Sequence, residues 1–184
     1  MENSEFTSFL RKKESQIPEK GLLVFDLYGT LIPNYGLAAM EQNTINFLHE
    51  AKKKGYILSI ATSSKDEDIV KNILKGDNVE DLFSSVVTGQ NSELHTERLM
   101  ITIRKVRELT GKLFKVNEVF HFDDDYRRIM QSKSLGVKHI MVCDDENAKI
   151  SIFGSDFLIN NFSNSDQIFN FLEGKGVQKR KIKN

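Results

Sequence analysis

The sequence predicts an α/β fold: a single three-layer domain in which a mostly parallel sheet lies between helices on both faces. Short apolar runs typical of buried strands recur along the chain, and amphipathic helical segments separate them. Polar or acidic residues follow several of these runs directly, as expected where strand ends form a ligand-binding edge. The predicted strands are residues 22–25, 56–64, 82–88, 118–122 and 137–143, with a shorter one at 156–159.

Length and charge agree with one domain and two short extensions. The chain has 184 residues, 39% hydrophobic and 28% charged, which is enough for one well-buried domain and too few for two. We divide it into an N-terminal helical extension (1–20), an α/β domain (21–173) and a basic tail (174–184). The tail holds five Lys and Arg and no acid, so the remainder carries 21 bases and 26 acids, a net charge of about −5. Such tails are usually solvated, and contact with nucleic acid is the weaker alternative.

Cysteine usage and apolar content indicate a cytoplasmic protein. The single cysteine, Cys143, cannot form an internal disulfide. The first residues lack the apolar segment of a secretory signal, and no stretch has the roughly 18 to 20 apolar residues of a membrane span. We therefore expect a cytoplasmic location and no membrane contact.

The helices follow from apolar spacing and from their stop signals. Residues 3–16 carry Phe6, Phe9 and Leu10 at helical spacing before Pro18, which predicts a short amphipathic helix. The other predicted helices are residues 38–54, 65–76, 92–109, 125–136 and 166–172. Only about ten residues (30–40) separate the first strand from its helix. This connection leaves little room for a cap domain, so we expect an open site.

The first strand ends in a carboxylate. Residues 22–25 form an apolar run typical of a strand buried on both faces, and Asp26, Gly29 and Thr30 follow it. The simplest alternative is that Asp26 only caps a turn, because Asp and Gly are ordinary turn residues. The run Asp123 to Asp125 after the fourth strand has a similar alternative, an acidic helix start favoured by the helix dipole.

A shared edge of the sheet gives these residues a common chemistry. Strand ends converge in a parallel sheet, so Asp26, Asp123 and Asp124 are predicted to meet residues 62–64 in one crevice. Converging carboxylates repel each other unless a hard cation neutralises them, and Mg²⁺ accepts such oxygen ligands together with a substrate phosphate. An Asp can also be the nucleophile that forms an aspartyl-phosphate. A Mg²⁺-dependent phosphohydrolase is therefore the leading hypothesis.

Several motifs resemble those of a known family. FDLYGTL at residues 25–31, ATSS at 61–64 and HFDDDYRRI at 121–129 resemble three ordered motifs of the haloacid dehalogenase (HAD) superfamily, over roughly residues 21–143. Within the superfamily, the stretch from HTERL to FDDDYRRI is most similar to small magnesium-dependent phosphatases with little or no cap. The resemblance implies the HAD-like Rossmannoid fold and a phosphorylated substrate, either a small molecule or a phosphoprotein.

The resemblance also implies a role for each matching residue. Asp26 would be the nucleophile and a Mg²⁺ ligand, and the Tyr28 carbonyl would bind the same ion. Asp123 would ligate the metal directly, with Asp124 supporting it, and Thr62 would bind the transferring phosphoryl group. The remaining substrate-binding residues would be Gly29, Thr30 and Ser63.

Two positions depart from the family pattern. Tyr28 stands where these phosphatases usually have a second Asp as general acid and base, and Glu93 matches their usual lysine. Losing general acid–base help typically costs about 10²- to 10⁴-fold in rate, while an anion in place of a cation adds repulsion. These departures favour, as the main alternative, an impaired domain that binds a partner or a phosphorylated ligand. A metal-free dehalogenase is the third hypothesis, because Tyr28 resembles the true dehalogenases.

Other charged residues and the four histidines are weaker candidates for the same site. Lys65, Arg98 and Lys112 are the candidates to replace the missing lysine in space. The four histidines share no metal-ligand spacing along the chain, and His121 lies inside an apolar run, so we expect it to be a packed strand residue.

Overall fold

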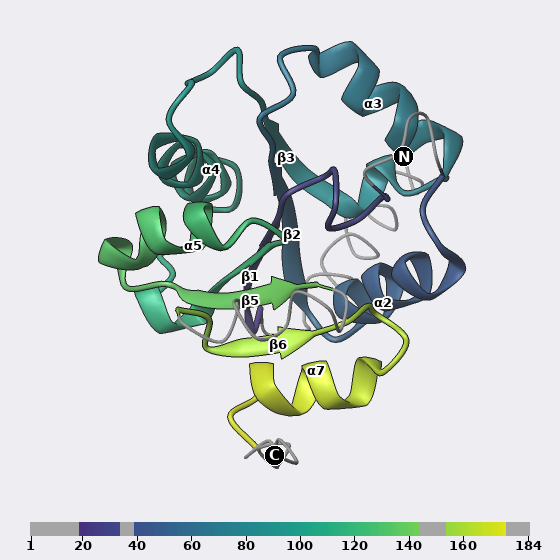
Figure 1. The fold of residues 1–184 in the computed structure, drawn as a ribbon, viewed down its shortest axis with the longest axis vertical. Helices are drawn as coiled ribbons and strands as arrows, with labels where there is room; N and C mark the ends of the chain where they lie inside the picture. Colours follow the sequence, from purple (N-terminus) through teal and green to yellow (C-terminus); the bar gives the residue numbers. More distant parts are fainter. Residues whose placement is uncertain (1–18, 34–38, 144–153, 176–184) are drawn as a thin grey trace, which may run out of the picture.

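A six-stranded parallel sheet forms the centre of the molecule (Figure 1). The computed structural model describes residues 19–33, 39–143 and 154–175. The strands are β1 (Gly21–Phe25), β2 (Tyr56–Ala61), β3 (Phe83–Val87), β4 (Val119–Asp123), β5 (Lys138–Val142) and β6 (Phe157–Ile159). Their order is β3-β2-β1-β4-β5-β6, and every pairing is parallel, so the predicted α/β fold is confirmed.

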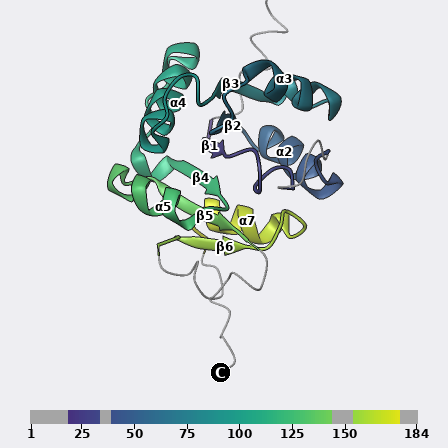
Figure 2. The same cartoon turned by 45° about the horizontal axis from the view of Figure 1, so that its top comes forward.

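Helices cover both faces of this sheet, which gives the predicted three layers. The helices are α2 (Gln42–Lys53), α3 (Glu67–Gly76), α4 (His95–Thr110), α5 (Tyr126–Ser132) and α7 (Ser165–Leu172), with single 3₁₀ turns η1 (Glu80–Leu82), η2 (Val116–Glu118) and η3 (Lys133–Leu135). Figure 2 shows α4 and α5 together on one side of the sheet and α2, α3 and α7 on the other. No cap domain occurs among the described residues, in keeping with the short connection after β1.

Strand alternation determines which side chains reach each face. Leu23 and Phe25 of β1 belong to the larger core cluster, which includes buried residues of α2, α3 and α7, whereas Leu22 and Val24 pack with Leu99 of α4. Aromatic rings fill the larger core, and the rings of Phe25 and Phe122 stack with centroids 4.6 Å apart. Asp26, which follows Phe25, therefore lies on the same face of the sheet as Leu22 and Val24, the face that α4 covers.

Observed helix starts differ from the predicted ones by a few residues. Helix α4 begins at His95 instead of Ser92, because the Ser92 hydroxyl accepts a hydrogen bond from the Leu94 N–H (3.1 Å) and donates one to Glu97 (2.6 Å). Helix α2 begins at Gln42, four residues after the predicted start. The predicted helix over residues 3–16 and residues 176–184 of the basic tail lie outside the described residues.

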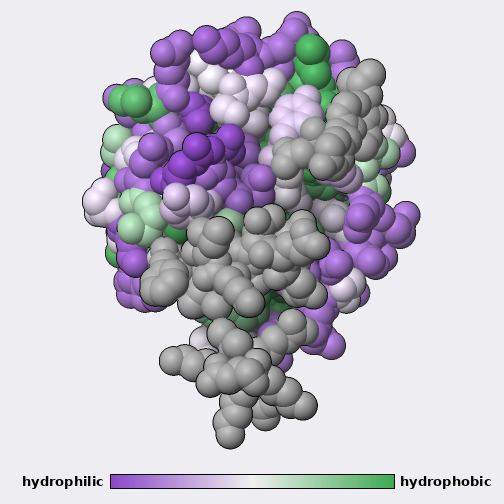
Figure 3. All heavy atoms as spheres, in the orientation of Figure 1, coloured by the Kyte–Doolittle hydropathy of each residue, from purple (hydrophilic) through white to green (hydrophobic). Residues whose placement is uncertain are grey.

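The surface in Figure 3 is largely hydrophilic, with the apolar groups scattered over it. Leu94, Leu109 and Leu113 are among the exposed large apolar residues. Within the described ranges, no helix combines the length and the apolar character that a bilayer span requires.

Candidate active site

The ends of β1, β2 and β4 bring the predicted site residues to one edge of the sheet. Phe25 and Phe122 are register partners, and the Asp26 N–H donates to the Phe122 carbonyl at 2.9 Å, so Asp26 lies beside Asp123. Thr62 follows β2, the other neighbour of β1, and is buried. Parallel pairing therefore places two carboxylates and a hydroxyl together, although up to a hundred residues separate them in sequence.

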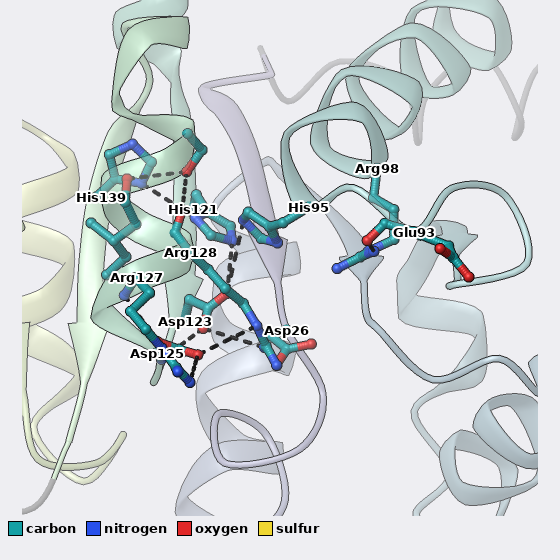
Figure 4. Close-up of polar contacts among 12 residues, drawn as sticks. Asp26, Glu93, His95, Arg98, His121, Asp123, Asp125, Arg127, Arg128 and His139 are labelled. Carbon is teal, nitrogen blue, oxygen red and sulfur yellow. Dashed lines mark hydrogen bonds and ion pairs between the residues drawn. The ribbon is translucent and has the colours of Figure 1, made fainter.

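A cation from α5 lies between the two carboxylates (Figure 4). Arg128 Nη1 lies 2.5 Å from Asp26 Oδ2 and 3.6 Å from Asp123 Oδ1, and 27% of its side chain is exposed. Helix α5 starts directly after β4 because the Asp125 carboxylate accepts the Arg127 N–H at 2.9 Å and caps the helix. Arg128 is thereby held in the first turn over the strand end. This role of Arg128 was not predicted from the sequence.

Burial makes both carboxylates costly to ionise. Burial raises the pKa of Asp26, and Arg128 together with the Thr62 hydroxyl offsets this only in part. Burial, followed by the charge of Asp26, raises the pKa of Asp123 well above its usual range. Two adjacent buried acids of this kind need positive charge nearby to be ionised together. Arg128 supplies one such charge.

The same carboxylates fit the donor set of a hard divalent cation. Asp26, Asp123 and Asp124 each offer an oxygen, and these oxygens lie within 4.8 Å of one another. Asp26 Oδ1 is buried and has no hydrogen-bond partner among the described residues, so it is available as a ligand. Carboxylate oxygens are what Mg²⁺ binds in proteins. The ion would compete with Arg128 for Asp26 Oδ2.

The predicted substrate-binding residues lie in the segments that directly follow β1 and β2. Thr62 Oγ1 accepts the Ser64 N–H at 3.4 Å, and the Ser63 side chain is exposed. Thr30 is buried and its hydroxyl has no partner in the described structure. Gly29 has a φ of 85°, which the turn after β1 requires, and its N–H donates to the Ile32 carbonyl at 2.7 Å. Tyr28 is partly buried and packs against the larger core cluster.

Of the three candidate replacements for the missing lysine, Arg98 is the one that interacts with the acidic group. Arg98 is buried in α4, its Nη1 donates to the Ser92 and Glu93 carbonyls at 2.9 and 2.8 Å, and the charges of Asp26 and Asp123 partly offset the effect of burial on its pKa. Arg98 is therefore electrostatically coupled to the site.

The two lysines are engaged outside the acidic group. Lys65 pairs with Glu93 at 3.1 Å, and both side chains are mostly exposed. In Figure 4, Glu93 lies apart from Asp26, so the repulsion expected from it is largely screened. Lys112 follows the other end of α4 and bonds to Glu19. The structure does not bring Lys112 into the site.

Two buried histidines lie beside Asp123 and a third contacts one of them, an arrangement that was not predicted from the sequence. His121 Nε2 and His95 Nε2 lie 3.5 and 4.0 Å from Asp123 Oδ2, and His121 Nδ1 lies 3.3 Å from His139 Nδ1. Burial lowers the pKa of His95 to about 3 and that of His121 well below its usual value, so both rings are neutral at pH 7. The prediction that His121 is a packed strand residue is confirmed by its complete burial in β4.

Comparison with known proteins agrees with this fold. The family model described as haloacid dehalogenase-like hydrolase matches residues 37–142. The chain therefore belongs to the haloacid dehalogenase-like hydrolase family, as its motifs predicted. No curated protein sequence matches the chain.

Solved structures show the same fold at low sequence identity. An uncharacterized protein from Listeria monocytogenes serotype 4b has a TM-score of 0.65 at 15% identity, covering 84% of this chain and 99% of that one. CbbY from Rhodobacter sphaeroides in complex with phosphate has a TM-score of 0.65 at 12% identity, over 78% and 95% of the two chains. L-2-haloacid dehalogenase from Xanthobacter autotrophicus, with chloropropionic acid covalently bound, has 0.61 at 11% identity, over 82% and 98%.

Proposed function

We propose that this protein hydrolyses phosphate esters through an aspartyl-phosphate on Asp26. The observation that carries the proposal is the pairing of Asp26 with Asp123 at the ends of adjacent strands, with the cation Arg128 between them. An Asp26 oxygen attacks phosphorus while the bond to the ester oxygen breaks, and water then displaces Asp26 and releases phosphate. Both steps concentrate negative charge at the phosphoryl group, so nearby positive charge is the main catalytic requirement.

We further propose Mg²⁺ as the cofactor. Asp26, Asp123 and Asp124, with the Tyr28 carbonyl, would hold it, and the bound ion would neutralise the carboxylates and the phosphate oxygens. Thr62 would bind a phosphoryl oxygen through its hydroxyl, with Ser63, Gly29 and Thr30 lining the same edge. Arg98 adds long-range positive charge from α4.

Tyr28 determines which substrates should react fastest. A phenol is a weak general base at neutral pH, and the leaving oxygen has no carboxylic acid at this position to protonate it. Esters with good leaving groups, such as aryl phosphates and acyl phosphates, should therefore turn over faster than alkyl phosphates. Relatives of similar fold support phosphate chemistry, since the CbbY structure holds phosphate.

One observation favours a second candidate function, an impaired domain that binds a phosphorylated ligand or a partner. Arg128 pairs closely with Asp26 and so occupies one oxygen of the nucleophile. Tyr28 also stands at the position where related phosphatases have an Asp as general acid. In that case phosphate would bind beside Arg128 without turnover. The cytoplasmic location and the phosphorylated small molecule or phosphoprotein as substrate remain predictions from the sequence.

The test is hydrolysis of 4-nitrophenyl phosphate with and without Mg²⁺. Wild type should be active only with Mg²⁺, and Asp26→Asn should lose nearly all activity while folding normally, because the two side chains are almost isosteric. Asp68→Asn, a change at an exposed helix position, is the matched control and should keep full activity. Phosphate binding without turnover in wild type would support the impaired domain. Chloride release from 2-chloropropionate without metal would support the dehalogenase.

A further inference from the structure

Two histidines and one carboxylate oxygen converge beneath the acidic group described above. His95 comes from the first turn of α4, whereas His121 and Asp123 lie two residues apart on β4 and so point to the same face. Their ligand atoms all lie within 4.8 Å of one another. Figure 4 shows the two imidazole rings directed toward Asp123.

All three side chains are buried and lack hydrogen-bond partners at the point of convergence. His95 is 5% exposed, and His121 and Asp123 are fully buried. Both ring nitrogens of His95, Nε2 of His121 and Oδ2 of Asp123 have no partner among the described residues. Burying a polar atom without a partner is unfavourable, so the three atoms that converge, Nε2 of each histidine and Oδ2 of Asp123, favour a bound cation at this point.

The distances argue against a simple histidine to carboxylate hydrogen bond. Such a charge-assisted bond is about 2.7–2.9 Å long, whereas the Nε2 to Oδ2 separations are 3.5 Å for His121 and 4.0 Å for His95. Ligands at about 2.0–2.2 Å from a tetrahedral Zn²⁺ are roughly 3.3–3.6 Å apart. The separation of His121 from Asp123 Oδ2 already matches this spacing, and that of His95 from the same oxygen exceeds it by a few tenths of an ångström.

The surroundings also prepare His121 to act as a ligand. Its Nδ1 faces His139 Nδ1 at 3.3 Å. If His121 Nδ1 carries the proton and donates it to His139, the lone pair is on Nε2 and points toward Asp123. Metal-binding histidines are commonly oriented by such a bond on the other ring nitrogen. The β-sheet holds this pair in place, because His121 and His139 are register partners on β4 and β5.

We propose that His95, His121 and Asp123 form a site for a divalent transition metal, with Zn²⁺ as the preferred ion. Two imidazoles and one carboxylate suit Zn²⁺, Fe²⁺ or Mn²⁺ better than Mg²⁺. Asp123 can serve this ion through Oδ2, because Oδ1 accepts the Asp125 N–H at 2.8 Å and faces Arg128. The ion would join the start of α4 to the end of β4 and fix Asp123 for the hydrolytic site. This site does not depend on the proposed phosphatase activity.

The test uses Co²⁺ and Zn²⁺ binding to the chelator-treated full chain in excess Mg²⁺. Wild type should bind about one equivalent of Co²⁺ with the visible absorption of a four- or five-coordinate nitrogen ligand set, and Zn²⁺ should displace it. His95→Ala should weaken Zn²⁺ binding at least tenfold. His49→Ala, a change at an exposed histidine of α2, should have no effect. Asp26→Asn should abolish hydrolysis yet keep the Co²⁺ spectrum, which separates this proposal from the proposed function.

Three results would overturn the proposal. These are the absence of Zn²⁺ binding at micromolar concentrations, equal affinity in wild type and His95→Ala, or a weak six-coordinate Co²⁺ spectrum typical of oxygen ligands. His121→Gln provides a second variant, because Gln keeps a polar side chain in β4 but removes the imidazole. If His121→Gln does not fold, the comparison of His95→Ala with His49→Ala still decides the outcome, because His95 lies at the end of a helix.

Discussion

Replacing Arg128 with Met should destabilise the protein and strengthen its binding of Mg²⁺. The change keeps most of the aliphatic stem but removes the cation that lies 2.5 Å from Asp26 and 3.6 Å from Asp123. Removing one partner of a buried ion pair costs about 3–5 kcal/mol, whereas exposed pairs contribute below about 1 kcal/mol. Because 27% of the Arg128 side chain is exposed, we expect an intermediate loss of roughly 2–3 kcal/mol.

Thermal and urea unfolding in EDTA at pH 7.5 measure this loss. A change of this size in a chain of this length lowers Tm by roughly 5–10 °C. The matched control is Arg127→Met, because Arg127 pairs with Asp125 through a largely exposed side chain and should contribute little to stability. Added Mg²⁺ should raise the Tm of Arg128→Met more than that of wild type, since the guanidinium no longer competes for Asp26.

The pH dependence gives a second check on the same variant. Without Arg128, the pKa values of Asp26 and Asp123 should rise further. The variant therefore loses stability only where these two carboxylates are ionised. The stability difference from wild type should therefore be large at neutral pH and should shrink as the pH falls toward 4. Equal losses for Arg128→Met and Arg127→Met, or a loss independent of pH, would refute the assignment of Arg128 as the cation of this site.

Three further changes test other parts of the account. Tyr28→Asp should raise alkyl phosphate turnover by about tenfold or more at saturating Mg²⁺, because poor leaving groups gain most from restored general acid–base help. Unchanged kcat for an alkyl phosphate in a folded variant would mean that this help is not missing. Asp123→Asn should be more stable than wild type in EDTA at pH 7, since burial and Asp26 raise the pKa of Asp123. This advantage should vanish in unfolding curves recorded well below pH 3.8, where the acid is protonated in both the folded and the unfolded state. Glu173→Gln should lower the free energy of unfolding by less than about 1 kcal/mol at pH 7, because Lys175 and Lys20 lower the pKa of Glu173 to about 2. This loss of stability should persist above pH 4.5 and disappear as the pH falls through about 2. A difference that survives at lower pH would come from packing.

Sequence reasoning succeeded where parallel pairing alone determines position. Asp26, Thr62 and Asp123 each follow an apolar strand, and the ends of parallel strands must lie at one edge, so their proximity could be predicted without knowing the packing of any helix. Strand alternation could also have placed His121 and Asp123 on one face, because they are two residues apart on β4. The apolar neighbours of His121 predicted its burial correctly but gave no sign of its contact with Asp123.

The residues that were missed depend on how helices dock on the sheet. Arg128 reaches Asp26 because Asp125 caps α5 two residues after the end of β4, so that the first turn of the helix lies over the site. His95 reaches Asp123 from α4, and neither contact has a signature in sequence spacing. Glu93 shows the opposite case, because its place in the motif suggested repulsion in the site, while the loop before α4 turns its carboxylate to Lys65.

Chemical trapping of the phosphorylated residue tests the central claim most directly. Aspartyl-phosphates are reduced by borohydride to homoserine, which mass spectrometry locates in the chain. Wild type incubated with Mg²⁺ and an aryl phosphate, then quenched and reduced, should contain homoserine at position 26, and the product should be absent from Asp26→Asn. Turnover without homoserine at position 26, or with the modification at Asp123 or another acid, would contradict the assignment of Asp26 as the nucleophile.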